Sequence, residues 1–244
     1  MLRGFIWAHE LRLRDRQLLE FQGFNGESKV RLLPTPWPLD ALPPPTSSLL
    51  SVASNRSLIA AAGPDSVVIA STDAVRETFS AKSEEGNIKP FTPQLVLPIG
   101  TRVSQVAFSA DESCLAICAE AGGGLAVYET GGLLQNKTHS AFEMATNGSS
   151  VRGLVPNPSP EKAELFAVIT TNGDLLIADM KSRQYIQGSN GQVIADGVSC
   201  VSWSNKGTQL VAGMGNGSAV QMTPQGQIKA QIPRADVEGD QHGR

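Results

Sequence analysis

Short apolar runs separated by polar turns recur along the chain from residue 49 onward. In the first run of each group, apolar and polar residues alternate, which is the pattern of a strand with one buried face. These first runs are residues 49–54, 103–109, 151–157 and 198–204. Their first residues are 54, 48 and 47 positions apart. This regular spacing indicates tandem supersecondary units.

Each first run is followed by a second run, a turn rich in Gly, Asn and Asp, and a third run. The second runs are residues 57–63, 113–120, 164–170 and 208–214, and the third runs are 67–72, 125–130, 175–180 and 219–223. Weaker fourth runs close three units, at residues 94–99, 141–145 and 226–232. Four strands per unit are typical of β-propeller blades. We therefore predict an all-β, WD-like β-propeller that is incomplete, with about four blades and a short helical insertion in the first.

The repeat divides the chain into a predicted series of segments. Residues 1–19 form an N-terminal extension, 20–46 an N-terminal strand with a Pro-rich connector, and 235–244 a tail. The predicted blades are residues 47–100 with an insertion at 72–93, 101–147, 148–196 and 197–234.

The stretch GMGNGS at residues 213–218 raises the alternative of a phosphate-binding loop. Such a loop needs a helix after its last glycine, because the N–H groups at the helix N-terminus hold the anion. The residues that follow, AVQMT, form a short strand pattern that ends at Pro224. We therefore predict a hairpin turn, in which Asn216 and Gly217 tolerate the positive φ that tight turns require.

The segments outside the repeat carry weaker patterns. Residues 34–45 hold six prolines, which predicts an extended or polyproline II connector, with a site for a proline-reading module as the alternative. Residues 24–33 predict a strand or hairpin, and such an N-terminal strand closes the ring in many propellers. Residues 1–19 alternate Arg with apolar residues, which favours an amphipathic helix.

The insertion at residues 72–93 is expected to begin with a short helix. Thr72 or Asp73 would be its N-cap, and Glu77 is an acidic residue near its start. A polar loop is expected to follow. The insertion is either a surface for a partner or a solvated decoration.

Composition restricts the class of partner. The formal net charge is −3 and no Lys/Arg run exceeds two residues, so the basic surface of a protein that grips nucleic acid is missing. Cys114 and Cys118 lie on one face of a predicted strand, about 13 Å apart at ~3.3 Å per residue, which is too far for a disulfide. No His lies near them to complete a zinc site. We predict two core cysteines, no metal and no cofactor.

The residues that could support catalysis are scattered. Histidines occur only at positions 9, 139 and 242, outside the strand runs, so no Ser–His–Asp arrangement is indicated. Several acids of the repeat lie mainly at turns or strand ends, where turn chemistry accounts for them, such as Asp65, Asp111, Glu112, Asp174 and Asp179. We predict no catalytic, cofactor-binding or metal-binding residue and no enzyme. A propeller hydrolase or lyase with acids around the central channel is the alternative.

Two third runs resemble those of WD repeats, which end in an aromatic and an acidic residue. Tyr128-Glu129 and Ala178-Asp179 stand at these positions, but no unit carries the Gly-His pair that opens such repeats. Phe108 and Trp203, near the ends of two first runs, are predicted to be core aromatics rather than a ligand platform.

Four segments carry a resemblance to one family. They are KVRLLPTPWPLDALPPPTSSLLSVASNRSLIAAAGPDSVVIAST (29–72), RVSQVAFSADESCLAICAEAGGGLAVYE (102–129), LVPNPSPEKAELFAVITTNGDLL (154–176) and DGVSCVSWSNKGTQLVAG (196–213). In this order they resemble the N-terminal β-propeller of the fungal cytoplasmic-face nucleoporin that docks the DEAD-box mRNA-export helicase. The similarity covers about residues 20–240.

The resemblance implies a non-enzymatic platform at the cytoplasmic face of the nuclear pore complex. Its partners would be a DEAD-box RNA helicase and, through regions absent from this chain, other nucleoporins. The platform would compete with RNA for the basic surface of the helicase. Direct nucleic-acid binding and membrane insertion are not implied. The alternative is a WD-like interaction scaffold in an unrelated complex. The helicase-contacting surface of the family lies largely on later blades, so no partner-binding residue is assigned.

The family propeller has seven blades, whereas the repeat here ends after four. We therefore expect a fragment that forms an open arc with apolar sheet faces bare at one or both ends. The chain contains no Phe-Gly dipeptide, so docking of transport receptors is not implied.

Overall fold

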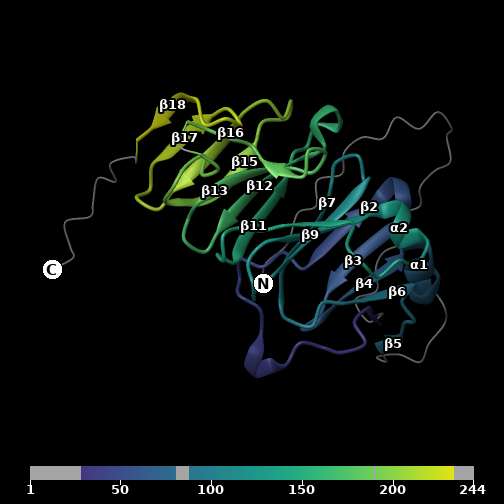
Figure 1. Ribbon diagram of the computed structural model, residues 1–244. Coiled ribbons are helices and arrows are strands. Elements are labelled where there is room, and N and C mark those ends of the chain that lie inside the picture. The colour runs from purple at the N-terminus through teal and green to yellow at the C-terminus, as the bar shows by residue number, and fades with distance from the viewer. Residues whose placement is uncertain (1–28, 81–87, 190, 234–244) are drawn as a thin grey trace.

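The computed structural model describes residues 29–80, 88–189 and 191–233. The predicted extension at 1–19 and the tail at 235–244, with His9 and His242, lie outside these residues. Among the described residues, four antiparallel sheets have four strands each, as the alternation predicted, and Figure 1 shows that the sheets follow one another along the chain. The all-β, propeller-like prediction is confirmed, while the boundaries assigned to the segments stay a prediction.

Each sheet is one blade, and its strands follow one another in sequence order. Blade 1 contains β2 (Leu50–Ala53), β3 (Leu58–Ala62), β4 (Ser66–Ser71) and β6 (Leu95–Pro98). Blade 2 contains β7 (Val103–Phe108), β8 (Cys114–Ala119), β9 (Leu125–Glu129) and β10 (Phe142–Met144). Blade 3 contains β11 (Val151–Pro156), β12 (Leu165–Thr170), β13 (Leu175–Asp179) and β14 (Gln184–Tyr185). Blade 4 contains β15 (Val198–Trp203), β16 (Leu210–Met214), β17 (Ala219–Met222) and β18 (Ile228–Ile232).

The blades pack face to face through three apolar clusters. Leu97 of blade 1 packs with Leu115 of blade 2, Phe166 of blade 3 lies in the cluster with blade 2, and Leu210 of blade 4 lies in the cluster with blade 3. The first strands lie side by side, because β7 contacts both β2 and β11. The first strands are therefore the inner strands of the arc, and the fourth strands lie at its periphery.

The GMGNGS stretch forms the predicted hairpin turn between β16 and β17. Gly217 has φ 86°, and its N–H donates to the carbonyl of Met214 at 3.0 Å. The N–H of Met214 in turn donates to the carbonyl of Ser218 at 2.8 Å. A strand follows rather than a helix, so the phosphate-loop alternative is excluded.

The insertion in blade 1 differs from its prediction in two ways. Helix α1 (Thr72–Ser80) is present, but Thr72 and Asp73 lie inside it. The capping oxygen belongs to Ser71, whose Oγ accepts a hydrogen bond from the N–H of Ala74 at 3.4 Å. The expected polar loop contains β5 (Ile88–Pro90), which pairs in parallel with β1 (Lys29–Arg31). Within the described residues the ladder partner of that segment is the insertion, and the ring-closing role predicted for residues 24–33 stays a prediction.

Several further elements were not predicted, among them single turns of 3-10 helix at Ser54–Arg56 and Pro160–Lys162. The proline-rich connector includes a single turn of 3-10 helix at Leu39–Ala41. Helix α2 (Thr130–Leu134) contains two glycines and is stabilised by packing, because Leu133 is buried in the cluster between blades 1 and 2. The fourth strand of blade 3, β14, has two residues, too few for an alternating pattern.

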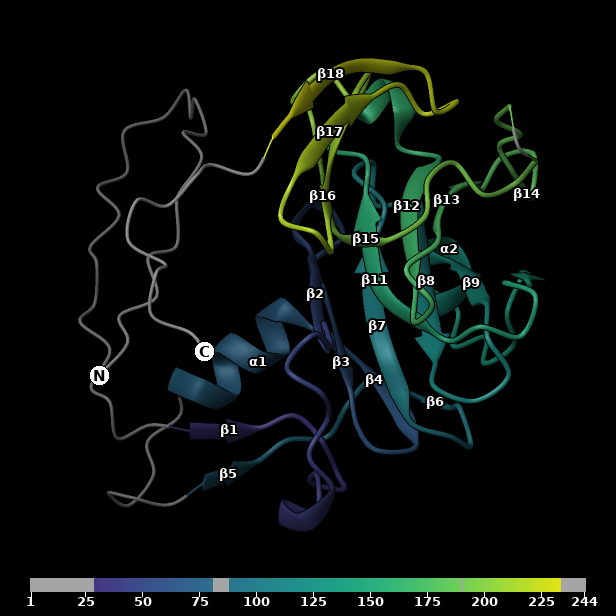
Figure 2. The same ribbon diagram turned by 90° about the vertical axis from the view of Figure 1, so that its left-hand side faces the viewer.

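The four blades form an open arc, as expected, and its two ends differ. In Figure 2, α1, β1 and β5 lie beside the face of blade 1 that points away from blade 2. On that face Val68 is buried, whereas Leu50 and Val52 are exposed. The corresponding face of blade 4 exposes Val211 and Ile232. Blade 1 is partly covered, and blade 4 is open.

Candidate interaction surface

Polar side chains link the inner strands at the same point of successive blades. A register shift follows the first residue of β7, β11 and β15 and leaves Ser104, Arg152 and Ser199 unpaired in the ladder. Ser104 Oγ donates to the carbonyl of Val151 at 2.8 Å, and the Arg152 guanidinium donates to the carbonyl of Val198. Ser104 and Arg152 thus each satisfy a backbone acceptor of the next blade, whereas Ser199 Oγ donates to the carbonyl of Gly213 in its own blade at 2.8 Å. The repeated Val-polar start of the first runs was the only sequence signal for this link.

A buried carboxylate joins blades 1 and 2. Glu112, in the turn between β7 and β8, is 8% exposed. Its Oε1 accepts hydrogen bonds from the backbone N–H and the side-chain amide of Asn55, both at 3.1 Å, and its Oε2 accepts one from the N–H of Arg56 at 2.9 Å. Glu112 lies in a turn, as predicted, but its role in joining the two blades depends on a neighbouring blade and was missed.

Blades 3 and 4 are joined by comparable contacts. The Asn157 side chain donates to the carbonyl of Gly207 at 2.9 Å. The indole N–H of Trp203 donates to the carbonyl of Val155 at 3.0 Å, while the ring is buried. Phe108 is buried as well. The prediction that Phe108 and Trp203 are core aromatics is confirmed.

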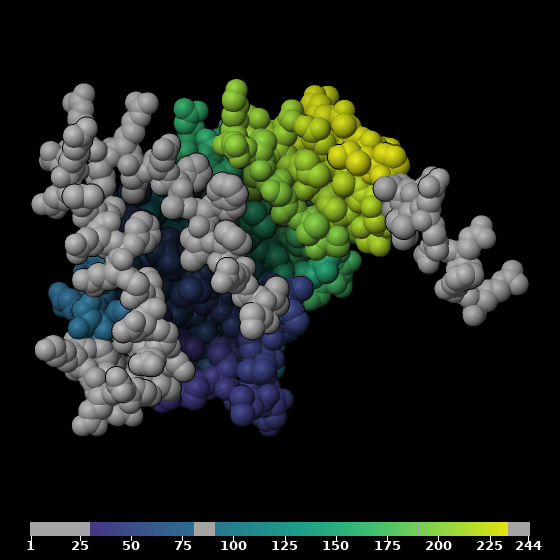
Figure 3. Space-filling view, turned by 180° about the vertical axis from the view of Figure 1, so that it is seen from behind, coloured from purple at the N-terminus to yellow at the C-terminus, as the bar shows by residue number. Residues whose placement is uncertain are grey.

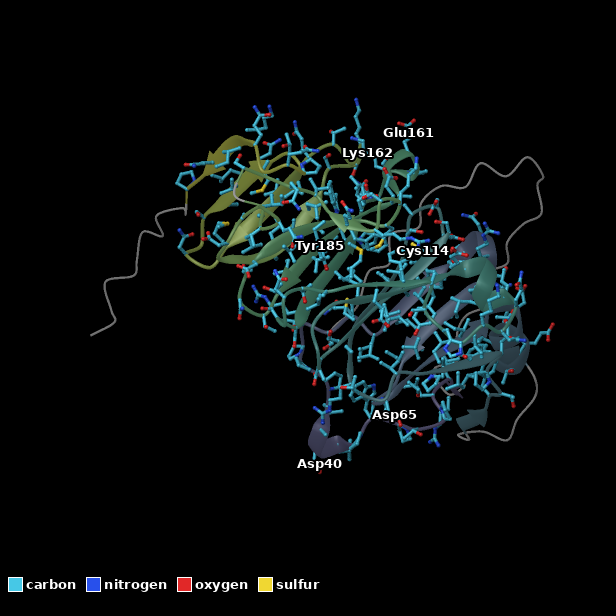
Figure 4. All side chains as sticks on the ribbon, in the orientation of Figure 1. Asp40, Asp65, Cys114, Glu161, Lys162 and Tyr185 are labelled. Atoms are coloured by element: carbon cyan, nitrogen blue, oxygen red, sulfur yellow. The ribbon has the colours of Figure 1, made fainter. Side chains whose placement is uncertain are left out.

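The two predicted core cysteines are buried free thiols on β8. Burial raises the pKa of Cys114 and of Cys118, so both thiols stay protonated at neutral pH and are poor nucleophiles. Tyr185, labelled in Figure 4, is also buried, and burial raises the pKa of its phenol, which donates to the carbonyl of Met144 at 3.4 Å. These groups pack the seam between blades 2 and 3.

The acids at strand ends stabilise turns. Partial burial alone would raise the pKa of Asp111, but hydrogen bonds from Ser109 and Ser113 outweigh it and hold the pKa below its usual value. Asp179 accepts hydrogen bonds from the N–H groups of Lys181 and Ser182 at 2.9 and 3.2 Å. In the described ranges no group of three or more His, Cys, Asp or Glu side chains is placed to hold a metal ion.

Charge is unevenly distributed between the two ends of the blades. Because successive strands run in opposite directions, the turns between second and third strands lie on the same side as the connections between blades. We call this side the turn face: residues 63–65, 99–102, 120–124, 145–150, 171–174, 191–197 and 215–218. Figure 4 places Asp65 at the lower edge and Glu161 and Lys162, of the turn between β11 and β12, at the upper edge.

The turn face carries four carboxylates, Asp65, Glu120, Asp174 and Asp196, and one cation, Arg102. Among the described residues, the only ion pair is formed elsewhere, between Arg76 and Asp73. The turn face therefore presents a negative potential to approaching molecules. No helix of the described residues is long and apolar enough to cross a membrane.

The family model and the curated relatives that match the chain agree on one family. The family model described as "NUP159/214 beta propeller" matches residues 43–243. Nucleoporin NUP159 of Chaetomium thermophilum is 46% identical over 240 residues, covering 98% of this chain and 16% of that protein. The human nuclear pore complex protein Nup214 is 25% identical over 226 residues, covering 90% of this chain and 10% of that protein. The chain thus spans less than a fifth of the length of these curated relatives.

Solved structures support the fold. A Saccharomyces cerevisiae structure of Dbp5 bound to Nup159, Gle1, IP6 and ADP superposes with a TM-score of 0.59 at 15% identity, covering 81% of this chain and 46% of that chain. The N-terminal domain of Nup159 superposes with a TM-score of 0.58 at 16% identity, covering 80% of this chain and 46% of that chain.

Proposed function

Because the chain belongs to the NUP159/214 beta propeller family, we propose that it is part of a nuclear pore complex component of the cytoplasmic face. Its blades serve as a non-enzymatic platform that docks a DEAD-box RNA helicase during mRNA export. The partner class agrees with the Saccharomyces cerevisiae structure in which Dbp5 is bound to Nup159.

The observation that carries this proposal is the acidic turn face on a rigid array of blades. A helicase that binds RNA offers a basic surface, and a negative face steers it toward the platform and raises the association rate. The same negative charge repels RNA, so the platform competes with RNA for the helicase surface without binding nucleic acid itself. The contacts between blades hold the turns in fixed positions, so the turns lose little conformational entropy when the partner binds.

Binding of the purified helicase to the immobilised chain, extended to seven blades because the family's helicase-contacting surface lies largely on later blades, tests the proposal, with Saccharomyces cerevisiae Nup159 and Dbp5 as positive control. The variant reverses three charges of the turn face, Asp65→Lys, Glu120→Lys and Asp174→Lys. We expect the association rate to fall about tenfold or more at low salt and to lose most of its salt dependence.

A matched control reverses three exposed charges outside the turn face, Glu77→Lys, Glu129→Lys and Glu161→Lys. It changes the net charge equally and should leave the association rate within about twofold of the parent. Absence of helicase binding at low salt, while the positive control binds, would contradict the proposal and favour the alternative of a scaffold in an unrelated complex.

A further inference from the structure

The outermost strand of blade 4 has an open edge. β18 runs over five residues, Ile228–Ile232, all of them exposed. It is the last strand of its sheet, and within the described part of the chain β17 is its only ladder partner. Figure 3 shows the last blade, in yellow, at the surface of the molecule. One row of backbone N–H and C=O groups of β18 is therefore free to pair with another strand.

The fourth strands of the other blades are protected against such pairing. β10 has three residues and β14 has two, so neither offers a continuous ladder. β6 ends in Pro98, which has no N–H to donate. Short strands and prolines are two of the usual protections of sheet edges, and β18 has neither, although it carries a bulge at Lys229.

A cavity of about 360 Å³ lies beside this edge. Met222 and Ile228 of blade 4 line it, together with residues 193–196 of the connection from blade 3. Ile228 is 54% exposed at its mouth. Asp196 supplies the only charge in the lining, and no cation balances it there. The cavity suits an aliphatic side chain with a basic neighbour.

We propose that β18 binds an extended segment of a partner protein, which adds a fifth strand to blade 4. Backbone hydrogen bonds along the edge provide affinity, and alternate side chains provide specificity. One aliphatic side chain of the segment enters the cavity, and a Lys or Arg of the segment lies beside Asp196. The site adjoins the turn face, which contributes residues 193–196 to the cavity, but the edge strand β18 itself is not part of that face.

The strand itself offers a matched pair of positions. A register shift between Gln221 and Met222 places Ile228 opposite Met222 and Ile232 opposite Ala219, so the two isoleucines lie on opposite faces of the sheet. Ile232 is 53% exposed, almost the same as Ile228, but does not line the cavity. Ile228→Lys therefore fills and charges the cavity mouth, and Ile232→Lys makes the same chemical change on the other face.

The test selects random nonapeptides displayed on phage against the full chain, then measures the affinity of the enriched synthetic peptides. We expect alternating sequences with an aliphatic residue and a nearby Lys or Arg. Ile228→Lys should weaken their binding about tenfold or more, because it removes an apolar anchor, and Ile232→Lys should change it less than about twofold. N-methylation of alternate peptide amides should abolish binding, since it removes the donors of the ladder.

Several outcomes would overturn the proposal. The first is that no peptide is enriched. The second is that the parent and the Ile228→Lys chain bind the enriched peptides equally well, and the third is that the N-methylated peptides keep their full affinity. A dimer that light scattering detects for the parent chain but not for the Ile228→Lys chain would also overturn it. Circular dichroism of both lysine variants, whose positions are exposed, verifies that the folded state is intact.

Discussion

Replacing Glu112 by Gln tests the seam between blades 1 and 2 with the smallest change of shape. Glu112 accepts three hydrogen bonds with two carboxylate oxygens. In the amide, the oxygen can keep both bonds from Asn55. The NH2 group then faces the N–H of Arg56, so a donor meets a donor. One hydrogen bond to a charged acceptor is lost, and the Arg56 N–H is left without its partner.

The magnitude follows from the burial of the site. A hydrogen bond to a charged group is worth about 1.5–3 kcal/mol, and an unsatisfied buried donor costs a similar amount. Because Asn55 and Arg56 are themselves exposed, water recovers part of the loss. We expect Glu112→Gln to lower the free energy of unfolding by about 2 kcal/mol, which corresponds to roughly 4–8 °C in Tm for a chain of this size.

Urea denaturation followed by circular dichroism measures this change. Glu161→Gln is the matched control, since it makes the same substitution in the turn between the first two strands of blade 3, where Glu161 is exposed. Its effect should stay within about 0.5 kcal/mol. Equal midpoints for the two variants would refute the role of Glu112 in joining the blades.

Three other changes have defined outcomes. Gly123 has φ 62°, and a Cβ there would lie 2.5 Å from a backbone oxygen, so Gly123→Ala should lower the free energy of unfolding by at least about 2 kcal/mol. Gly122 has φ 89° and no atom within 4 Å of such a Cβ, so Gly122→Ala should cost only the backbone strain of about 1 kcal/mol. Thermal melting distinguishes the two variants. Asp111 has a lowered pKa when folded, so its stabilisation is present above the unfolded pKa of about 3.9 and is lost as pH falls through the folded value. In urea titrations Asp111→Asn should therefore be less stable than the parent at pH 7, and the difference should shrink below pH 4, while a constant difference would contradict the hydrogen-bonded carboxylate. Trp203→Phe removes the bond to Val155 and should lower the urea midpoint by the equivalent of about 1–3 kcal/mol; an unchanged midpoint would contradict that contact.

The sequence predicted those parts of the fold that depend on local patterns. Strands such as β7 and β12 alternate or are continuously apolar, and the Asn216-Gly217 turn requires a backbone that few other residues adopt. Position in a repeat strengthened each assignment, because equivalent runs occur in all four units.

Contacts between segments distant in sequence could not be predicted in this way. The parallel pairing of β1 with β5 joins segments almost 60 residues apart, and neither has more than three residues in the ladder. Glu112 reads as an ordinary turn acid until the turn of blade 1 is placed beside it. The acidic turn face likewise appears only when four separate loops are brought to one side by the strand order.

Amide hydrogen exchange measured by mass spectrometry tests the central claim that the four blades are joined into one rigid platform. The second strands β3, β8, β12 and β16 should exchange slowly and with similar protection, because each is paired on both sides within its sheet. Exchange in one of these strands as fast as in the hairpin turns would contradict the claim, because it would mean that a blade opens independently of its neighbours.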